Sequence, residues 1–238
     1  MTAQHDVVFL LDCDNTLFDN DRFETDLSDH FVQVFGVASR NRYWELLEQL
    51  RNEVGYADYL GALQRARQQD VSDARLFKTT AFLLDYPFAS RVYPGALDVV
   101  RHLDTFGLTV ILSDGDVVYQ PRKLEHAGLW DAVKGRVLIP IHKERTLAAV
   151  AMRYPARHYV IIDDKLRILA AVKKIWGDRV TTVFPKQGHY AFDPRNTEAY
   201  PAADLTIDRI GDLANQDFAE MPAARGSTSA GVAALPGG

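Results

Sequence analysis

The stretch VVFLLDCDNT, residues 7–16, decides the fold of this chain. Its first five residues are apolar, as in a buried strand, and two carboxylates, Asp12 and Asp14, follow them directly. In a parallel α/β sheet, ligands bind outside the carboxyl ends of the strands, so both acids are expected at an active-site edge. Two acids there can hold a hard cation, or one can attack an electrophile while the other moves a proton.

Similar apolar runs recur along the chain, with amphipathic stretches of helical length between them. The predicted strands cover residues 7–11, 108–112, 136–140, 159–162, 180–184 and 203–207. The predicted helices between them cover residues 94–106, 117–127, 146–154 and 166–176. This alternation predicts an α/β fold with a parallel sheet and helices on both faces.

Residues 19–91 interrupt the alternation. They contain no strong strand pattern, and we expect helices there, with Gly36 as a C-cap and Ser39 and Ser72 as N-caps. A helical insert directly after the first strand would lie above the carboxyl edge of the sheet and form a lid over the two acids. The alternative is that these helices only extend the core. The four predicted helices cover residues 22–35, 39–54, 56–68 and 72–84.

The chain is therefore expected to divide into three parts. Residues 1–18 and 92–222 form an α/β core, and residues 19–91 form a helical cap. Residues 223–238 are rich in Ala, Gly and Ser, have little to bury, and are expected to be a disordered tail.

Composition restricts the class of function. The 238 residues carry a formal net charge of −5, which argues against a nucleic-acid partner, because phosphate backbones select basic faces. The single cysteine, Cys13, excludes an internal disulfide framework, and we expect it to be buried rather than nucleophilic. We expect no signal peptide, no membrane partner and a cytoplasmic location, as a monomer or dimer.

Polar groups also follow the ends of later predicted strands. Ser113 closes the second core strand, and Lys143 follows the third. Asp163 and Asp164 close the fourth. Each is weak evidence alone, because a serine at a strand end is usually a helix cap and a lysine is usually solvated. In this order, with the acids of the first strand, they describe a site with carboxylates near a metal, a hydroxyl donor and a cation.

With these features the chain resembles the haloacid dehalogenase (HAD) superfamily of phosphohydrolases over residues 6–212. The motif LDCDNTLF, residues 11–18, is specific, and the later Asp pair is less so. The helical insert resembles the C1-type cap of the family, and the turn at residues 93–96, YPGA, resembles its return from cap to core. The resemblance implies a Rossmann-like core with a helical cap inserted after the first strand, and a small phosphorylated metabolite as substrate.

The resemblance also implies a role for each site residue. Asp12 is the nucleophile and forms an aspartyl-phosphate. Asp14 is the general acid/base, which protonates the leaving alcohol and then activates water. Thr16 steadies the loop, while Ser113 and the backbone N–H of Asp114 bind the transferring phosphoryl group.

Cations complete the implied site, because a carboxylate approaches a phosphoryl group only when positive charge screens the repulsion. Lys143 neutralises the nucleophile and the phosphate. The implied Mg²⁺ ligands are Asp12, the backbone carbonyl of Asp14, and the pair Asp163 and Asp164. Of this pair, Asp164 is preferred as the direct ligand, and Asp163 as its support.

The sequence departs from the family pattern in places. Asp114 stands where many relatives have asparagine, and Glu144 rather than proline follows Lys143. Residues 165–168, KLRI, replace small residues. Other candidates for the cationic role are Lys123, Lys134 and Lys165.

The turn between two helices of the insert is expected to influence substrate choice. Gly55 would allow a close approach to the core, and Tyr56 or Asp58 could contact the leaving group. The alternative is a simple helix connector with aromatic packing. His189, in the loop after the fifth strand, is expected to be structural, since Asp14 fills the acid/base role.

The sequence favours a Mg²⁺-dependent phosphatase that acts through an aspartyl-phosphate. Dehalogenases of the superfamily attack carbon and lack an acid two residues after the nucleophile, whereas an oxygen leaving group needs one. One alternative is a phosphomutase acting on a sugar phosphate. A second is a catalytically weak phosphate-ligand or protein-binding module, suggested by Asp114 and by the residues after Asp164.

Overall fold

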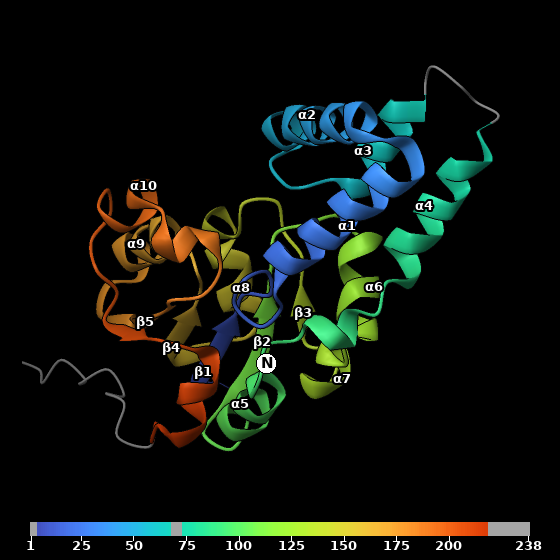
Figure 1. Cartoon of the computed structure of the whole chain (residues 1–238). Helices are drawn as coiled ribbons and strands as arrows, with labels where there is room; N and C mark the ends of the chain where they lie inside the picture. The colour runs from blue at the N-terminus through green and yellow to red at the C-terminus, as the bar shows by residue number, and fades with distance from the viewer. Residues whose placement is uncertain (1–3, 68–72, 219–238) are drawn as a thin grey trace, which may run out of the picture.

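A computed structural model of the chain describes residues 4–67 and 73–218 (Figure 1). The predicted tail and the N-cap residue Ser72 lie outside the described residues. In the described part of the chain, six strands form one sheet in the order β3-β2-β1-β4-β5-β6, and neighbouring strands are parallel. The strands are β1 (His5–Leu11), β2 (Leu108–Leu112), β3 (Val137–Leu138), β4 (Ala156–Ile162), β5 (Val180–Pro185) and β6 (Leu205–Ile207).

The predicted α/β fold with a Rossmann-like parallel sheet is confirmed. Strand β3 is shorter than predicted, because it pairs only with β2, which ends at Leu112 beside Leu138. The strand order changes direction at β1, whose neighbours are β2 on one side and β4 on the other. Such a switch point leaves a crevice at the carboxyl ends of the strands, where the predicted acids follow β1.

Strand β1 is buried on both faces, which explains its uninterrupted apolar sequence. Phe9 and Leu11 belong to one hydrophobic cluster, and Val8 and Leu10 belong to another. Helices α5 (Ala96–Leu103), α6 (Tyr119–His126) and α7 (Leu129–Ala132) contribute to the first cluster. Helices α8 (Leu147–Arg153) and α9 (Leu166–Trp176) contribute to the second, and a short α10 (Pro194–Thr197) follows β5.

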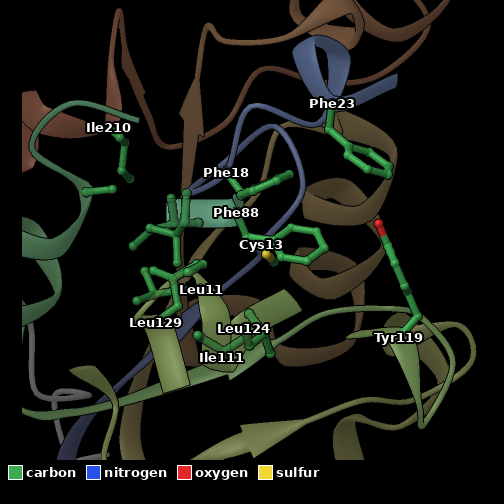
Figure 2. Packing of buried hydrophobic residues seen from close by; sticks show 14 of the residues in the cluster. Leu11, Cys13, Phe18, Phe23, Phe88, Ile111, Tyr119, Leu124, Leu129 and Ile210 are labelled. Carbon is green, nitrogen blue, oxygen red and sulfur yellow. The ribbon is translucent and has the colours of Figure 1, made fainter. Parts of the chain in front are cut away.

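Cys13 lies inside the first cluster, as Figure 2 shows. Its side chain is fully buried, and this burial raises the pKa of its thiol well above the ordinary value. The expectation that Cys13 is buried is confirmed.

Among the described residues, four α-helices lie between β1 and α5, as the sequence predicted. They are α1 (Asn20–Phe35), α2 (Val37–Val54), α3 (Tyr59–Ala66) and α4 (Ala74–Asp85). In Figure 1, α2 and α3 lie side by side at the top of the view, and α1 connects them to the centre of the sheet. The first hydrophobic cluster continues into these helices, through Phe23 of α1 and Leu47 of α2. The base of the helical segment is therefore part of the core.

Gly36 separates α1 from α2 by itself. Its φ of +86° lets the chain turn within one residue, and its N–H donates to the carbonyl of Val32. The predicted N-cap at Ser39 is wrong, because α2 already begins at Val37 and the Ser39 hydroxyl donates to the carbonyl of Phe35, the last residue of α1. Within the described residues, no helix is both long and apolar enough to cross a membrane.

Candidate active site

A pocket of about 300 Å³ opens at the carboxyl end of β1. One wall comes from the sheet, because its residues follow the ends of β1, β2, β3 and β4. The opposite wall comes from the helical segment, through α1, α2 and the turn before α3. The predicted site residues on the pocket wall are Asp12, Asp14, Tyr56, Ser113, Asp114 and Lys143.

Lys143 lies between carboxylates that follow the ends of two strands. Its side chain is buried, and its ammonium contacts Asp12 Oδ1 and lies 2.7 Å from Asp163 Oδ2. Burial alone would lower its pKa, but Asp12 and Asp163 hold that pKa well above the ordinary value. Lys143 is therefore a fixed cation between two carboxylates that come from different strands.

Asp114 helps to place this lysine. Its Oδ1 accepts a hydrogen bond of 2.7 Å from the backbone N–H of Lys143. Burial raises the pKa of Asp114, and the neighbouring Lys143 opposes that rise. The carboxylate that departs from the family pattern thus has a partner within the site.

Asp12, Asp163 and Asp164 are buried, and each offers an oxygen within 4.8 Å of the others. Asp163 already uses both oxygens, one for Lys143 and one for the backbone N–H of Lys165 at 2.9 Å. Neither oxygen of Asp164 has a hydrogen-bond partner among the described residues, and burial raises its pKa well above the ordinary value. Buried carboxylates require compensation. The cluster therefore fits a hard cation with oxygen ligands, with Asp164 as the better direct ligand.

Asp14 lies on the pocket wall, and its side chain is 29% exposed. Lys123 of α6 contacts its Oδ1 from the interior. The carboxylate therefore has one side toward the pocket and one oxygen bound to a buried lysine. Sequence reasoning named Lys123 only as a substitute for Lys143, whereas the structure places it on the other acid.

Ser113 is buried at the end of β2, and its Oγ accepts a hydrogen bond of 3.0 Å from Gln120. Its own hydroxyl proton is therefore left to donate into the pocket. Thr16 is fully buried and is not on the pocket wall. The sequence pattern missed Gln120, whose only signal is its position on the helix that follows Ser113.

The helical wall carries a polar network that sequence reasoning also missed. The Tyr59 hydroxyl donates to Glu24 at 2.7 Å, and Asn20 donates to the same hydroxyl at 3.2 Å. Arg51 lies 3.9 Å from Glu24. Burial raises the pKa of Glu24. The pocket thus offers a leaving group both a carboxylate and a guanidinium.

The turn before α3 approaches the core closely. A Cβ on Gly55 would lie 2.7 Å from Nε2 of His142, in the loop after β3. Tyr56 lines the pocket, whereas Asp58 is the N-cap of α3 and accepts a 2.7 Å hydrogen bond from Gly61. Of the two residues considered for leaving-group contact, only Tyr56 is on the pocket wall.

Besides the approach of Gly55 to His142, the two walls are in contact at His189. Its backbone N–H donates to Asp21 Oδ2 at 2.7 Å, and its ring Nδ1 lies 2.6 Å from Asp21 Oδ1. These contacts agree with a structural role for His189. Of the remaining candidate lysines, Lys165 lines the pocket, with its ammonium 4.7 Å from the Tyr190 ring centroid. Lys134 pairs with Asp104, away from the pocket.

Comparison with solved structures finds a relative of high identity. A haloacid dehalogenase-like hydrolase from Burkholderia xenovorans is 63% identical, with a TM-score of 0.85, and the match covers 90% of this chain and 99% of that one. No family model and no curated protein matches the chain.

More distant structures share the fold alone. A haloacid dehalogenase-like hydrolase from Xanthomonas campestris is 20% identical, with a TM-score of 0.63 over 90% of this chain and 91% of that one. The HAD-hydrolase YfnB from Bacillus subtilis, bound to magnesium, is 16% identical, with a TM-score of 0.61 over 87% and 96%. Other matched structures, below 20% identity, are named dehalogenases.

Proposed function

Since the chain belongs to the haloacid dehalogenase-like hydrolases, we propose that it is a Mg²⁺-dependent phosphatase acting through an aspartyl-phosphate. One observation carries the choice of phosphate esters over carbon–halogen bonds. Asp14, two residues after the nucleophile, lies on the pocket wall with Oδ1 held by Lys123. An alkoxide leaving group needs a proton, whereas a halide does not. We also propose a small phosphorylated metabolite as the substrate and a cytoplasmic location, as expected from the sequence.

In the first step, an Asp12 oxygen bonds to phosphorus as the ester P–O bond breaks. The leaving oxygen takes a proton from the Asp14 carboxyl. Lys143, which contacts Asp12, offsets the charge of the nucleophile and of the phosphoryl group. The Ser113 hydroxyl donates to a phosphoryl oxygen.

In the second step, Asp14 accepts a proton from water as the water oxygen bonds to phosphorus. The bond between Asp12 and phosphorus breaks, and inorganic phosphate leaves. The site returns to its first state, because Asp14 holds the proton that the next leaving group requires.

The cation would be held by Asp12 and Asp164, with Asp163 in support and the backbone carbonyl of Asp14 as a further ligand. When bound, Mg²⁺ supplies positive charge that offsets the three carboxylates and the phosphate. The buried, unpartnered oxygens of Asp164 support this assignment.

The direct test is hydrolysis of p-nitrophenyl phosphate by the purified protein, with Mg²⁺ and with a chelator. We expect Mg²⁺-dependent turnover that Asp12→Asn abolishes. The matched control is Asp6→Asn, in β1, the strand that Asp12 follows; Asp6 is exposed and paired with Arg157, so this variant should leave the rate unchanged. Equal rates with and without metal, or full activity in Asp12→Asn, would contradict the proposal.

A second assay separates the competing activities. Chloride release from a 2-chloro acid without phosphate release would indicate a dehalogenase. Isomerisation of a sugar phosphate without free phosphate would indicate a phosphomutase. Saturable ligand binding without turnover, across sugar phosphates, nucleotides, phosphoglycolate and phosphorylated amino acids, would indicate a binding module.

A further inference from the structure

Lys123 is one of two lysines that are buried among the described residues, and the other is Lys143. It lies in α6 with 1% of its surface exposed. An ammonium in the interior costs several kcal/mol unless a partner compensates its charge. The place of Lys123 in the fold therefore depends on what it contacts.

The contacts of Lys123 lead to Asp14. Its ammonium contacts Asp14 Oδ1 and lies 5.2 Å from the centroid of the Phe18 ring. Within residues 4–67 and 73–218, Asp14 is its only ion-pair partner. Asp14 follows β1, whereas Lys123 belongs to the helix after β2, so the contact joins two segments 109 residues apart.

The two oxygens of Asp14 differ in their surroundings. Oδ1 is held by Lys123, and no hydrogen bond to Oδ2 is found among the described residues. The carboxylate lines the pocket together with Asp12 and Ser113. The lysine thus leaves one oxygen unpaired at the pocket.

We propose that Lys123 is a positioning residue that holds the Asp14 carboxyl from the interior, so that its second oxygen meets the leaving group. This inference rests on the proposed phosphatase activity and extends it to a residue outside the pocket wall. The competing explanation is that the ion pair only stabilises the core. The two explanations predict different effects of a Lys123 variant: a positioning role affects substrates whose leaving group needs a proton, and a purely stabilising role affects all substrates alike.

The test compares two substrates on the same preparation of Lys123→Met. A p-nitrophenolate leaves without needing a proton, whereas the alkoxide of an alkyl phosphate needs one. We expect kcat/KM, which reports the steps up to loss of the leaving group, to fall about 10- to 100-fold for an alkyl phosphate and far less for p-nitrophenyl phosphate. This is a part of the roughly 10²- to 10⁴-fold that general acid–base catalysis contributes. The ratio of the two rates does not depend on how much of the sample is folded.

A double-mutant cycle shows whether Lys123 acts through Asp14. In the Asp14→Asn background, Lys123→Met should have no further effect on the alkyl phosphate. Arg122→Met is the matched control on the same helix, since Arg122 pairs with Asp85 and is not on the pocket wall, and it should keep the wild-type ratio.

Two results would overturn the inference. One is an equal loss of kcat/KM on both substrates, and the other is an undiminished loss of kcat/KM in the Asp14→Asn background. Failure of the proposed function would look different, because the wild-type protein would then release no phosphate from either substrate.

Discussion

The two walls of the pocket are built in different ways. On the sheet wall, Asp12 and Lys143 are 5% and 3% exposed, and their contacts join residues far apart in the chain. On the helical wall, the side chains of Glu24 and Arg51 are 26% and 37% exposed. The charges of the sheet wall are thus buried and paired, while the groups of the helical wall are more exposed. We infer from this difference that the proposed reaction takes place at the sheet wall and that the helical wall influences the choice of substrate.

The walls also differ in electrostatic balance. Three buried carboxylates cluster at the sheet edge, of which Asp12 is on the pocket wall, and Lys143 contacts two of the three. On the helical wall, the Glu24 carboxylate accepts hydrogen bonds from Tyr59 and Asn20 without any buried cation. We therefore expect variants of the sheet wall to act on chemistry and metal binding, and variants of the helical wall to act on substrate affinity.

The largest effect is expected for Lys143→Met. It removes the cation between Asp12 and Asp163, so kcat for p-nitrophenyl phosphate should fall about 100- to 1,000-fold, as when one fixed electrostatic donor is lost. Steady-state kinetics at saturating Mg²⁺ measures the loss. Lys134→Met, which removes an exposed lysine paired with Asp104, should change kcat by less than about twofold. Similar kcat values for both variants would contradict the assignment of the chemistry to the sheet wall.

Metal binding should give the next largest effect. At a Mg²⁺ concentration about 100 times the Kd, binding should stabilise the wild type by about 2.7 kcal/mol. For a chain of this size, that is a rise in Tm of roughly 5–11 °C. Asp164→Asn should abolish the rise, and without metal it should melt higher than the wild type, because one buried like charge is gone. Thermal melts with Mg²⁺ and with chelator measure both the rise in Tm on metal binding and the difference in Tm between the two proteins without metal. A rise that survives in Asp164→Asn would exclude this carboxylate as a ligand.

The sheet wall was predictable from the sequence because of how parallel strands meet. Residues that follow strand ends converge at one edge, so Asp12, Ser113 and Lys143 could be gathered without knowing any contact. Lys123 could not be placed in this way. A lysine in the middle of an amphipathic helix has the pattern of a solvated residue, and only the packing of α6 against the loop after β1 buries it.

The helical wall was predictable in its elements but not in its contacts. Amphipathic spacing and Gly36 predicted its helices, because these signals are local. The network of Glu24, Arg51 and Tyr59 joins residues 27 and 35 positions apart, which no local pattern encodes. The division into core and cap stays a prediction, since one hydrophobic cluster spans both parts.

Gly55→Ala should give a moderate effect on the helical wall. Its Cβ would lie 2.7 Å from the His142 ring, so the turn carrying Tyr56 would move away from the core. We expect kcat/KM for the best substrate to fall about 10-fold, which corresponds to about 1.4 kcal/mol. Gly36→Ala is a matched control, because its φ of +86° is close to the +92° of Gly55 and its Cβ would meet nothing within 4 Å. Both variants should melt lower by a similar amount, and only Gly55→Ala should lose activity. Equal activity losses would mean that backbone strain, rather than the contact with His142, is responsible.

The smallest effect is expected where the loop after β5 meets α1. Burial alone would raise the pKa of Asp21, but hydrogen bonds from His189 and Asn15 hold it below the ordinary value. A lowered pKa in the folded state means that the stabilisation is present above the unfolded pKa of about 3.9 and is lost as the pH falls through the folded value. Asp21→Asn should therefore lose about 0.5–1 kcal/mol at pH 6, since the pair is partly exposed, and less at pH 3. Urea unfolding of both proteins across this pH range measures the difference. A difference that stayed constant or grew toward low pH would contradict this, because the ionised carboxylate would then not be the form that His189 and Asn15 stabilise.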